Sequence, residues 1–525
     1  MAERGGQMGL GAFLSGSGAH GGSWRHPQAD ADASLNFQRY RHYAQTLERG
    51  CFDALFLNDN VAVGDLDPRV LARSSYSLRW DPLTLLPALA VVTRHIGLIA
   101  TASTSYNEPY NLARKFASLD HLSEGRAGWN LVTGLVGGEN FNHPEPLSHA
   151  ERYAGDPLTL LPALAVVTRH IGLIATASTS YNEPYNLARK FASLDHLSEG
   201  RAGWNLVTGL VGGENFNHPE PLSHAERYAR AEEFFSVASG LWDSWADDAF
   251  PRDKASGQWL RPERMHLLQH RGRHFQVQGP LNAPRPLQGW PVIAQAGSSG
   301  PGCELAARCA ELVFTAQTDL QQAKAFYREL KERLPAYGRH AGQLKIFPGI
   351  APTVGRTLNE AEEKYQQLQE LQDPQAQLKA LSYLLDLGID LSHLPLHTQV
   401  PLLDDAAPTE RHKSRRHLVQ ELIRRERPSL AQLLRSLSAS GHKVLVGTPG
   451  QIVDELATWY QEYAADGFNV LFTHLPGAID DFVQLITPEL QRRGLFRQRY
   501  TGHSLREHLG LARVENRFFS HRGNG

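Results

Sequence analysis

Cysteine is scarce in this chain of 525 residues, which contains only Cys51, Cys303 and Cys309. Three thiols cannot form the disulfide framework of a small secreted domain, so a reducing compartment is the simplest setting. Acidic and basic residues nearly balance, at 55 against 53. The chain therefore has no strong overall charge to attract nucleic acid or an anionic membrane.

Long apolar runs are also missing, since none approaches the ~18–20 residues that span a bilayer. The first six residues lack the basic stretch and apolar run that begin a secretory signal. The 24 histidines include no His-Glu-x-x-His pair, and no Cys-x-x-Cys pair accompanies them. These absences predict a cytoplasmic protein with no metal site, no membrane span and no nucleic-acid partner.

One segment of the chain occurs twice, letter for letter. Residues 81–154 return as residues 156–229, with Gly155 at the seam. Solenoid repeats are shorter, come at least in threes and drift apart in sequence. We therefore interpret 81–155 and 156–230 as a tandem duplicate, whose origin in recent copying, engineering or sequence assembly stays open.

Strand-like apolar runs alternate with helical patterns along the rest of the chain, which is typical of a parallel sheet with right-handed crossovers. With one copy left out, eight such runs remain. They are residues 8–14, 52–57, 171–176, 202–207, 291–296, 311–315, 344–350 and 469–472. Eight strands predict an α/β protein with a (β/α)8 TIM barrel, in a single domain that spans residues 1–525.

The duplicate adds two strands and two helices to this pattern. Strand number in a barrel is coupled to strand tilt and shear, so we expect eight strands to close and one copy to be extruded. Two other regions are additions to the strands and helices of a minimal barrel. Residues 243–290 are rich in polar residues, Pro and Gly and suggest a loop with a hairpin, and residues 358–440 suggest a polar helical insertion.

The strongest local motif is the small-residue turn Gly-Ser-Ser-Gly-Pro-Gly at 297–302, between an apolar strand and a helical pattern. Backbone N–H groups at a helix start lack partners, and the helix dipole adds positive potential, so this turn suits a phosphate. The hydroxyls of Ser298 and Ser299 would add donors. The alternative interpretation is a serine-capped helix behind a flexible turn.

Two further motifs match known sites only in part. Residues 16–21 have the spacing G-x-G-x-x-G, but the segment that follows runs into Pro27 and cannot start the helix that a dinucleotide site needs. Residues 297–301 resemble a nucleophile elbow, but Pro301 replaces its last glycine. We therefore expect neither a Rossmann domain nor a serine hydrolase.

Several separated segments resemble luciferase-like flavin-dependent monooxygenases, namely the family of the nitrilotriacetate, dibenzothiophene-sulfone and pristinamycin monooxygenases. The segments are 24–27 (WRHP), 53–59 (DALFLND), 176–185 (TASTSYNEPY), 203–208 (GWNLVT), 270–275 (HRGRHF), 297–302 (GSSGPG), 475–482 (LPGAIDDF) and 488–496 (PELQRRGLF). Apart from the extra copy, the likeness runs from Leu10 to Phe518.

The resemblance implies a two-component enzyme on a luciferase-like barrel. A separate NAD(P)H:flavin reductase would deliver reduced FMN (FMNH2), which reacts with O2 through a flavin C4a-hydroperoxide and oxygenates a small organic substrate. Sulfur- and nitrogen-containing compounds are the substrates we expect. A homodimer or homotetramer is expected by analogy alone.

The resemblance also implies a set of FMN-binding residues at the carboxyl ends of the strands. They are Asp59 at the isoalloxazine edge, Thr104 or its twin Thr179 and Asn130 or its twin Asn205 beside the ring, and His224, Tyr228, Ser298 and Ser299 at the phosphate. As alternatives, Asp59 could cap a turn and Tyr228 could simply pack.

His20, just past the first strand, is our candidate catalytic residue, as a hydrogen-bonding or proton-transfer group. The alternative is a loop histidine without a catalytic task. Two other functions also stay open for the whole chain. One is a flavin-binding protein without turnover, because the duplication disrupts the pocket, and the other is a barrel that uses the deazaflavin F420.

Overall fold

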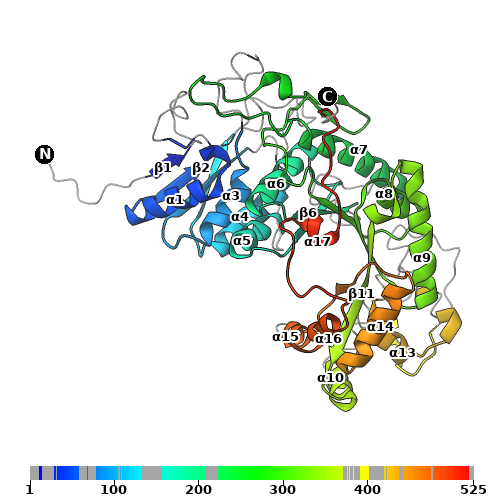
Figure 1. Cartoon of the computed structure of the whole chain (residues 1–525). Helices are drawn as coiled ribbons and strands as arrows, with labels where there is room; N and C mark the ends of the chain where they lie inside the picture. The colour runs from blue at the N-terminus through cyan, green and yellow to red at the C-terminus, as the bar shows by residue number, and fades with distance from the viewer. Residues whose placement is uncertain are drawn as a thin grey trace. The chain divides into compact units, whose positions relative to one another are not determined.

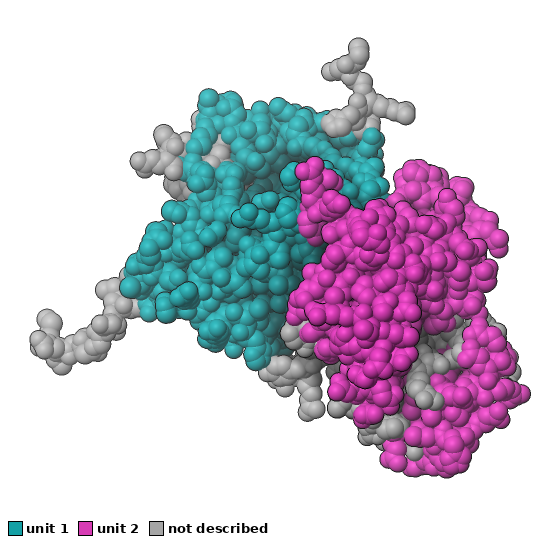
Figure 2. Space-filling model, turned by 60° about the horizontal axis from the view of Figure 1, so that its bottom comes forward, with its two compact units in different colours: residues 1–222, 229–292, 502–525 teal, residues 223–228, 293–501 magenta. Residues whose placement is uncertain are grey.

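The computed structural model divides the chain into two compact units, which Figure 2 shows in teal and magenta. Unit 1 comprises residues 1–222, 229–292 and 502–525, and unit 2 comprises residues 223–228 and 293–501. The residues that the structure describes are 11–14, 29–30, 32–57, 59, 68, 78–103, 107, 109–132, 157–208, 223–370, 375, 378, 382, 391–400, 419–420, 423–436, 442–474 and 477–519.

Four parallel strands begin unit 1 and pair in chain order, with a helix between each strand and the next (Figure 1, blue to cyan). Leu55, Leu57 and Leu98 are buried in these strands, so their short apolar runs form the interior of the sheet. The elements are β1 (Gly11–Leu14), α1 (Phe37–Arg49), β2 (Ala54–Leu57), α3 (Pro82–Ala90), β3 (Gly97–Ser103), α4 (Pro109–Leu122) and β4 (Ala127–Val132).

The second copy of the duplicate forms the same elements again: α5 (Pro157–Val167), β5 (Leu173–Ser178), α6 (Pro184–Leu197) and β6 (Ala202–Val207). Helix α7 (His224–Trp242) follows. Local hydrogen bonds recur as well. Arg126 donates to Thr93 Oγ1 at 3.0 Å, and its twin Arg201 donates to Thr168 Oγ1 at 3.0 Å. Each copy therefore folds by the same local interactions.

The two copies differ in what covers them. Trp204 in β6 is fully buried against Phe234 of α7, whereas its twin Trp129 in β4 is 40% exposed. The preceding helices show the reverse, since Leu89 of α3 is buried and its twin Leu164 of α5 is 38% exposed. Because both copies form regular elements within unit 1, the structure does not confirm that one copy is extruded.

Unit 2 is built on parallel strands in the order β9-β10-β11-β12, with β13 also beside β11. Parallel strands joined by helices in both units confirm the predicted α/β class. The elements of this unit include β9 (Val292–Gln295), α8 (Gly300–Cys309), β10 (Leu312–Thr315), α9 (Leu320–Arg333), β11 (Lys345–Val354), α10 (Leu358–Glu370), α13 (Leu430–Ser436), β12 (Lys443–Gly447), α14 (Pro449–Gln461) and β13 (Asn469–Val470).

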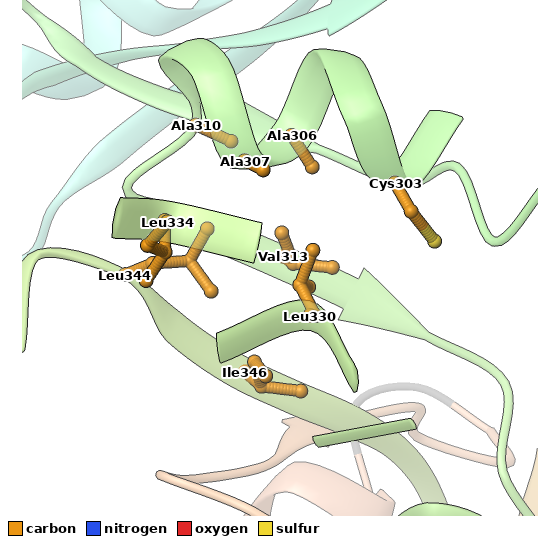
Figure 3. Close-up of a cluster of buried hydrophobic side chains, with 9 residues drawn as sticks. All are labelled: Cys303, Ala306, Ala307, Ala310, Val313, Leu330, Leu334, Leu344 and Ile346. Carbon is orange, nitrogen blue, oxygen red and sulfur yellow. The ribbon is translucent and has the colours of Figure 1, made fainter. Parts of the chain in front are cut away.

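A buried cluster fixes α8 and α9 on this sheet (Figure 3). Ala306 and Ala307 of α8 and Leu330 of α9 are buried together with Val313 of β10 and Ile346 of β11. Small side chains on α8 let the helix approach the strands closely at the density of a protein interior. The cluster therefore packs α8 against β10 and β11.

Smaller elements complete the two units. Within residues 243–290, a short antiparallel hairpin pairs His270 with Val277. No helix in the described part of the chain is both long and apolar enough to cross a membrane. The remaining elements are β7 (His270–Arg271), β8 (Gln276–Val277), α15 (Gly477–Asp481), α16 (Thr487–Arg492), α17 (Leu505–Leu509), the 3-10 helices Ala33–Leu35, Pro262–Arg264, Leu334–Tyr337, Ala341–Gln343 and Leu391–His393, and the π-helix Phe482–Ile486.

Candidate functional site

The small-residue turn at 297–302 joins β9 to α8 in unit 2. Ser299 is the N-cap of α8, with an extended backbone (φ −74°, ψ 160°) and a hydroxyl that accepts a hydrogen bond from the Gly302 N–H at 3.3 Å. The turn is tight, because a Cβ on Gly297 would lie 3.1 Å from the Gly302 Cα. Ser299 thus has the capping role that its residue type favours.

The outer side of this turn is open. A Cβ on Gly300, the first residue of α8, would meet no atom within 4 Å. The N–H groups of the first helical turn lack intrahelical partners, and the dipole of this ten-residue helix places partial positive charge there. A small anion can therefore approach the backbone at this point.

Three buried polar side chains lie behind the turn, at the carboxyl ends of β9 and β10. Gln295, Thr315 and Gln317 are only 5%, 3% and 6% exposed. Gln317 donates from Nε2 to Thr315 Oγ1 at 3.2 Å, and Thr315 Oγ1 lies 3.4 Å from Ser298 Oγ. Gln295 Oε1 is buried and has no hydrogen-bond partner among the described residues. An unpaired buried acceptor of this kind costs ~1–3 kcal/mol relative to a hydrogen-bonded one.

His224 and Tyr228 lie at the start of α7, with their ring centroids 4.8 Å apart. Residues 223–228 belong to unit 2, as does the serine turn. The four residues predicted at the phosphate, His224, Tyr228, Ser298 and Ser299, therefore all lie in one unit.

Asp59 belongs to unit 1, where both of its carboxylate oxygens are engaged by a buried arginine. Arg189 of α6 donates from Nη1 to Asp59 Oδ2 at 3.0 Å and from Nη2 to the other oxygen. The same guanidinium lies 3.9 Å from the Asp81 carboxylate. Burial by itself lowers the pKa of Arg189, but the two carboxylates raise it by more, so the side chain stays charged.

The residues predicted beside the flavin ring also lie at strand ends in unit 1. Thr179 follows β5, is fully buried and donates from Oγ1 to the Val207 carbonyl at 3.3 Å. Asn205 in β6 donates to Thr176 Oγ1 at 2.9 Å, and its twin Asn130 makes the equivalent bond at 3.0 Å. The Asn205 Oδ1 atom is buried and has no partner in the described part of the chain.

Two of the predicted site residues lie outside the described residues. They are His20, the candidate catalytic group, and Thr104, the twin of Thr179. Their roles stay predictions.

A protein-family model described as luciferase-like monooxygenase matches the chain twice, at residues 17–155 and at 138–467. Each match contains one copy of the duplicate. Two curated relatives extend the likeness over nearly the whole length. N-acetyl-S-(2-succino)cysteine monooxygenase of Bacillus subtilis (strain 168) is 41% identical over 514 residues, which is 98% of each chain. Nitrilotriacetate monooxygenase component A of Aminobacter aminovorans is 42% identical over 515 residues, which cover 97% of this chain and 98% of that protein.

The fold agrees with these sequence matches. A crystal structure of riboflavin lyase, solved with modified FMN and the substrate riboflavin, matches with a TM-score of 0.60 at 26% identity and covers 96% of each chain. An α/β fold of the barrel type is therefore shared along with the sequence. The chain belongs to the luciferase-like monooxygenase family.

Proposed function

We propose that this monooxygenase uses FMNH2 and O2 to oxygenate a small carboxylate-bearing amine or thioether. The serine turn of unit 2 is the observation that carries the proposal. It combines an open helix start, a serine hydroxyl backed by buried polar groups, and two further predicted phosphate ligands in the same unit.

The residues present fit a phosphate monoester well. Its charge suits the start of α8, and Ser298, His224 and Tyr228 offer side-chain donors for its oxygens. In unit 1, Asn205 has an unpaired amide oxygen that can accept a hydrogen bond from an N–H group. When bound, reduced FMN supplies the two electrons that activate O2, and the protein supplies position and protection from water.

The substrate class follows from the names of the relatives. Both curated relatives are named for compounds that carry carboxylates beside a nitrogen or a sulfur atom. The proposed reaction inserts oxygen into a C–H bond next to that heteroatom: R–H, O2 and FMNH2 give R–OH, H2O and FMN. A hydroxyl at such a carbon makes a hemiaminal, hemithioacetal or hemithioketal, which splits into an aldehyde or ketone and an amine or thiol.

A separate protein has to regenerate the reduced cofactor. One relative is named as component A of its monooxygenase, which suggests a division of labour between polypeptides. We therefore propose an NAD(P)H:flavin reductase as the partner of this chain. Cytoplasmic location, a closed ring of eight strands and a homodimer or homotetramer belong to the same proposal.

The test is to supply the purified full-length protein with FMNH2 and 18O2, together with N-acetyl-S-(2-succino)cysteine or nitrilotriacetate. We expect substrate-dependent formation of an aldehyde or keto acid, with one 18O atom in the hydroxylated product and the other in water for each flavin oxidised. Ser298→Ala should raise the FMNH2 concentration needed for half-maximal rate, because it removes a phosphate donor.

Two outcomes of this experiment would contradict the proposed function and support one of its alternatives. Saturable FMN binding with only H2O2 released, whatever the substrate, would support a flavin-binding protein without turnover. Anaerobic reduction of a bound deazaflavin F420, with no binding of FMN, would support the deazaflavin barrel.

A further inference from the structure

The hydroxyl of Ser298 has a buried hydroxyl as its partner. Thr315, at the carboxyl end of β10, places its Oγ1 at 3.4 Å from Ser298 Oγ. A threonine hydroxyl has one proton to donate and lone pairs to accept. Either hydroxyl can therefore be the donor in this contact.

Gln317 extends this contact into a chain. Its Nε2 donates to Thr315 Oγ1 at 3.2 Å, and an amide NH2 can only donate. The Thr315 oxygen accepts this bond and keeps its own proton, which it can donate to Ser298. When an anion accepts the Ser298 proton, the three donors then point one way, from Gln317 through Thr315 and Ser298 to the anion.

Burial keeps this chain of hydrogen bonds in one arrangement. Thr315 and Gln317 are 3% and 6% exposed, so water cannot easily replace either partner. Hydrogen bonds in series polarise one another in such surroundings. The chain therefore holds the Ser298 side chain at the start of α8 and supports its hydroxyl when that hydroxyl donates to an anion.

A second feature of the same turn points to a ligand. Gln295 is 5% exposed and its Oε1 has no partner among the described residues. Its amide group lies directly against the turn, because a Cβ built on Gly297 would come within 2.3 Å of Gln295 Nε2. A buried amide with an unpaired oxygen thus lies beside the Ser298 hydroxyl and the open start of α8.

We propose that Thr315 and Gln317 are positioning residues that hold the Ser298 hydroxyl as a donor to the phosphate of FMN, and so make the site select FMN over riboflavin. The inference rests on the proposed function, because it assigns a selectivity to the same cofactor site. Neither residue touches the phosphate; each acts through Ser298.

The test compares FMN with riboflavin, which lacks only the phosphate. Both are titrated against the full-length protein by quenching of flavin fluorescence. Thr315→Val keeps the shape of the side chain but removes the hydroxyl. We expect it to weaken FMN binding about 5- to 10-fold, as for loss of one hydrogen bond to a charged group, and riboflavin binding less than about 2-fold.

A double-mutant cycle isolates the route through Ser298. In a Ser298→Ala background, Thr315→Val should leave FMN affinity unchanged, because the hydroxyl that it orients is gone. Gln317→Leu should behave like Thr315→Val, and it keeps the test decisive if one of the two variants folds poorly. Thr353→Val is the matched control, because Thr353 in β11 is also buried and its hydroxyl has no partner in the described part of the chain.

The outcomes distinguish the positioning role of Thr315 and Gln317 from FMN binding itself. A loss that affects FMN and riboflavin equally, or that persists in the Ser298→Ala background, would overturn the positioning role while FMN binding itself stood. Unchanged FMN affinity in both Thr315→Val and Gln317→Leu would also overturn the positioning role. Failure of the folded wild-type protein to bind either flavin would instead count against the proposed function.

Discussion

At the scale of single residues, Arg189 and Arg114 are the same position of the two copies, and Arg189 is the one that binds Asp59 in the described part of the chain. Arg189→Met would leave the carboxylates of Asp59 and Asp81 buried without this partner. We expect a loss of ~3–5 kcal/mol in the free energy of unfolding, measured by urea titration. Arg114→Met, at the half-buried twin position, should cost less than Arg189→Met, because Asp59 then keeps its partner.

The comparison is informative because the two segments have identical sequences. Equal losses for Arg189→Met and Arg114→Met would mean that either copy fills the place beside Asp59. That result would contradict the assignment of α6 to this ion pair.

His196 of α6 should make stability depend on pH. Burial lowers its pKa from 6.5 to about 4. Between these two pKa values His196 binds a proton in the unfolded chain but not in the folded protein. The free energy of unfolding therefore falls as the pH drops from 6.5 towards 4. Each pH unit in this window costs up to ~1.4 kcal/mol.

Thermal melts across this pH range check the effect of His196. His196→Gln should flatten the dependence, and His121→Gln, at the exposed twin position, should leave it as in the wild type. An unchanged slope in His196→Gln would assign the dependence to other groups.

Sequence reasoning found the serine turn but not the side chains behind it. The turn is a local pattern, so the sequence of residues 297–302 predicts it without knowledge of the fold. The links from Gln317 to Thr315 and on to Ser298 join two strands whose adjacency no local pattern reveals. The signal that was available is a polar residue at the end of each buried strand, as in Gln295 and Thr315.

At the scale of elements, α3 and α5 have one sequence in two environments. Leu89→Ala in buried α3 should lower the free energy of unfolding by ~2–5 kcal/mol, because it leaves a cavity. Leu164→Ala, the same change on the exposed face of α5, should cost less than ~1 kcal/mol. Urea unfolding of both variants measures the difference, and a larger loss in Leu164→Ala would reverse the assignment of the buried helix.

Most strands were predictable because buried parallel strands are continuous apolar runs. Strand β12 (Lys443–Gly447) was not among the predicted runs, although it pairs with β11 over five residues. The part of β11 that pairs with it contains Pro352, and a proline within a run argues against predicting a central strand there. In the structure Pro352 nevertheless lies opposite Leu445. Tertiary pairing decides such short strands, and local sequence does not.

At the scale of the whole molecule, sequence cannot say which copy fills which place, because two identical segments have identical propensities. Packing against the unrepeated neighbours decides, as the different burial of Trp129 and Trp204 shows. The prediction of a single-domain barrel for residues 1–525 counted the strands of only one copy of the duplicate. The structure, which contains both copies, forms two compact units. That prediction is best tested on a chain with one copy.

Deleting residues 81–155 should raise the melting temperature and tighten FMN binding, because eight strands can then close without a second copy. Deleting 156–230 gives the same chain except that Gly155 replaces Arg230. Arg230 donates to the Thr179 carbonyl at 3.2 Å and lies 4.3 Å from the Phe275 ring centroid. The second product should therefore be less stable than the first by ~1–2 kcal/mol.

Calorimetric melts and flavin titrations of the two products and the full chain provide the measurement. Unchanged melting and binding in both products would show that the extra copy does not disturb the fold.

The central claim is that this chain binds FMN through the serine turn at the start of α8. Its most direct test is titration of the folded full-length protein with oxidised and with anaerobically reduced FMN, with folding checked by circular dichroism on the same sample. The account predicts saturable binding of one FMN per chain at micromolar concentrations, weakened in Ser298→Ala. A folded protein that binds neither form of FMN at high micromolar concentrations would contradict it.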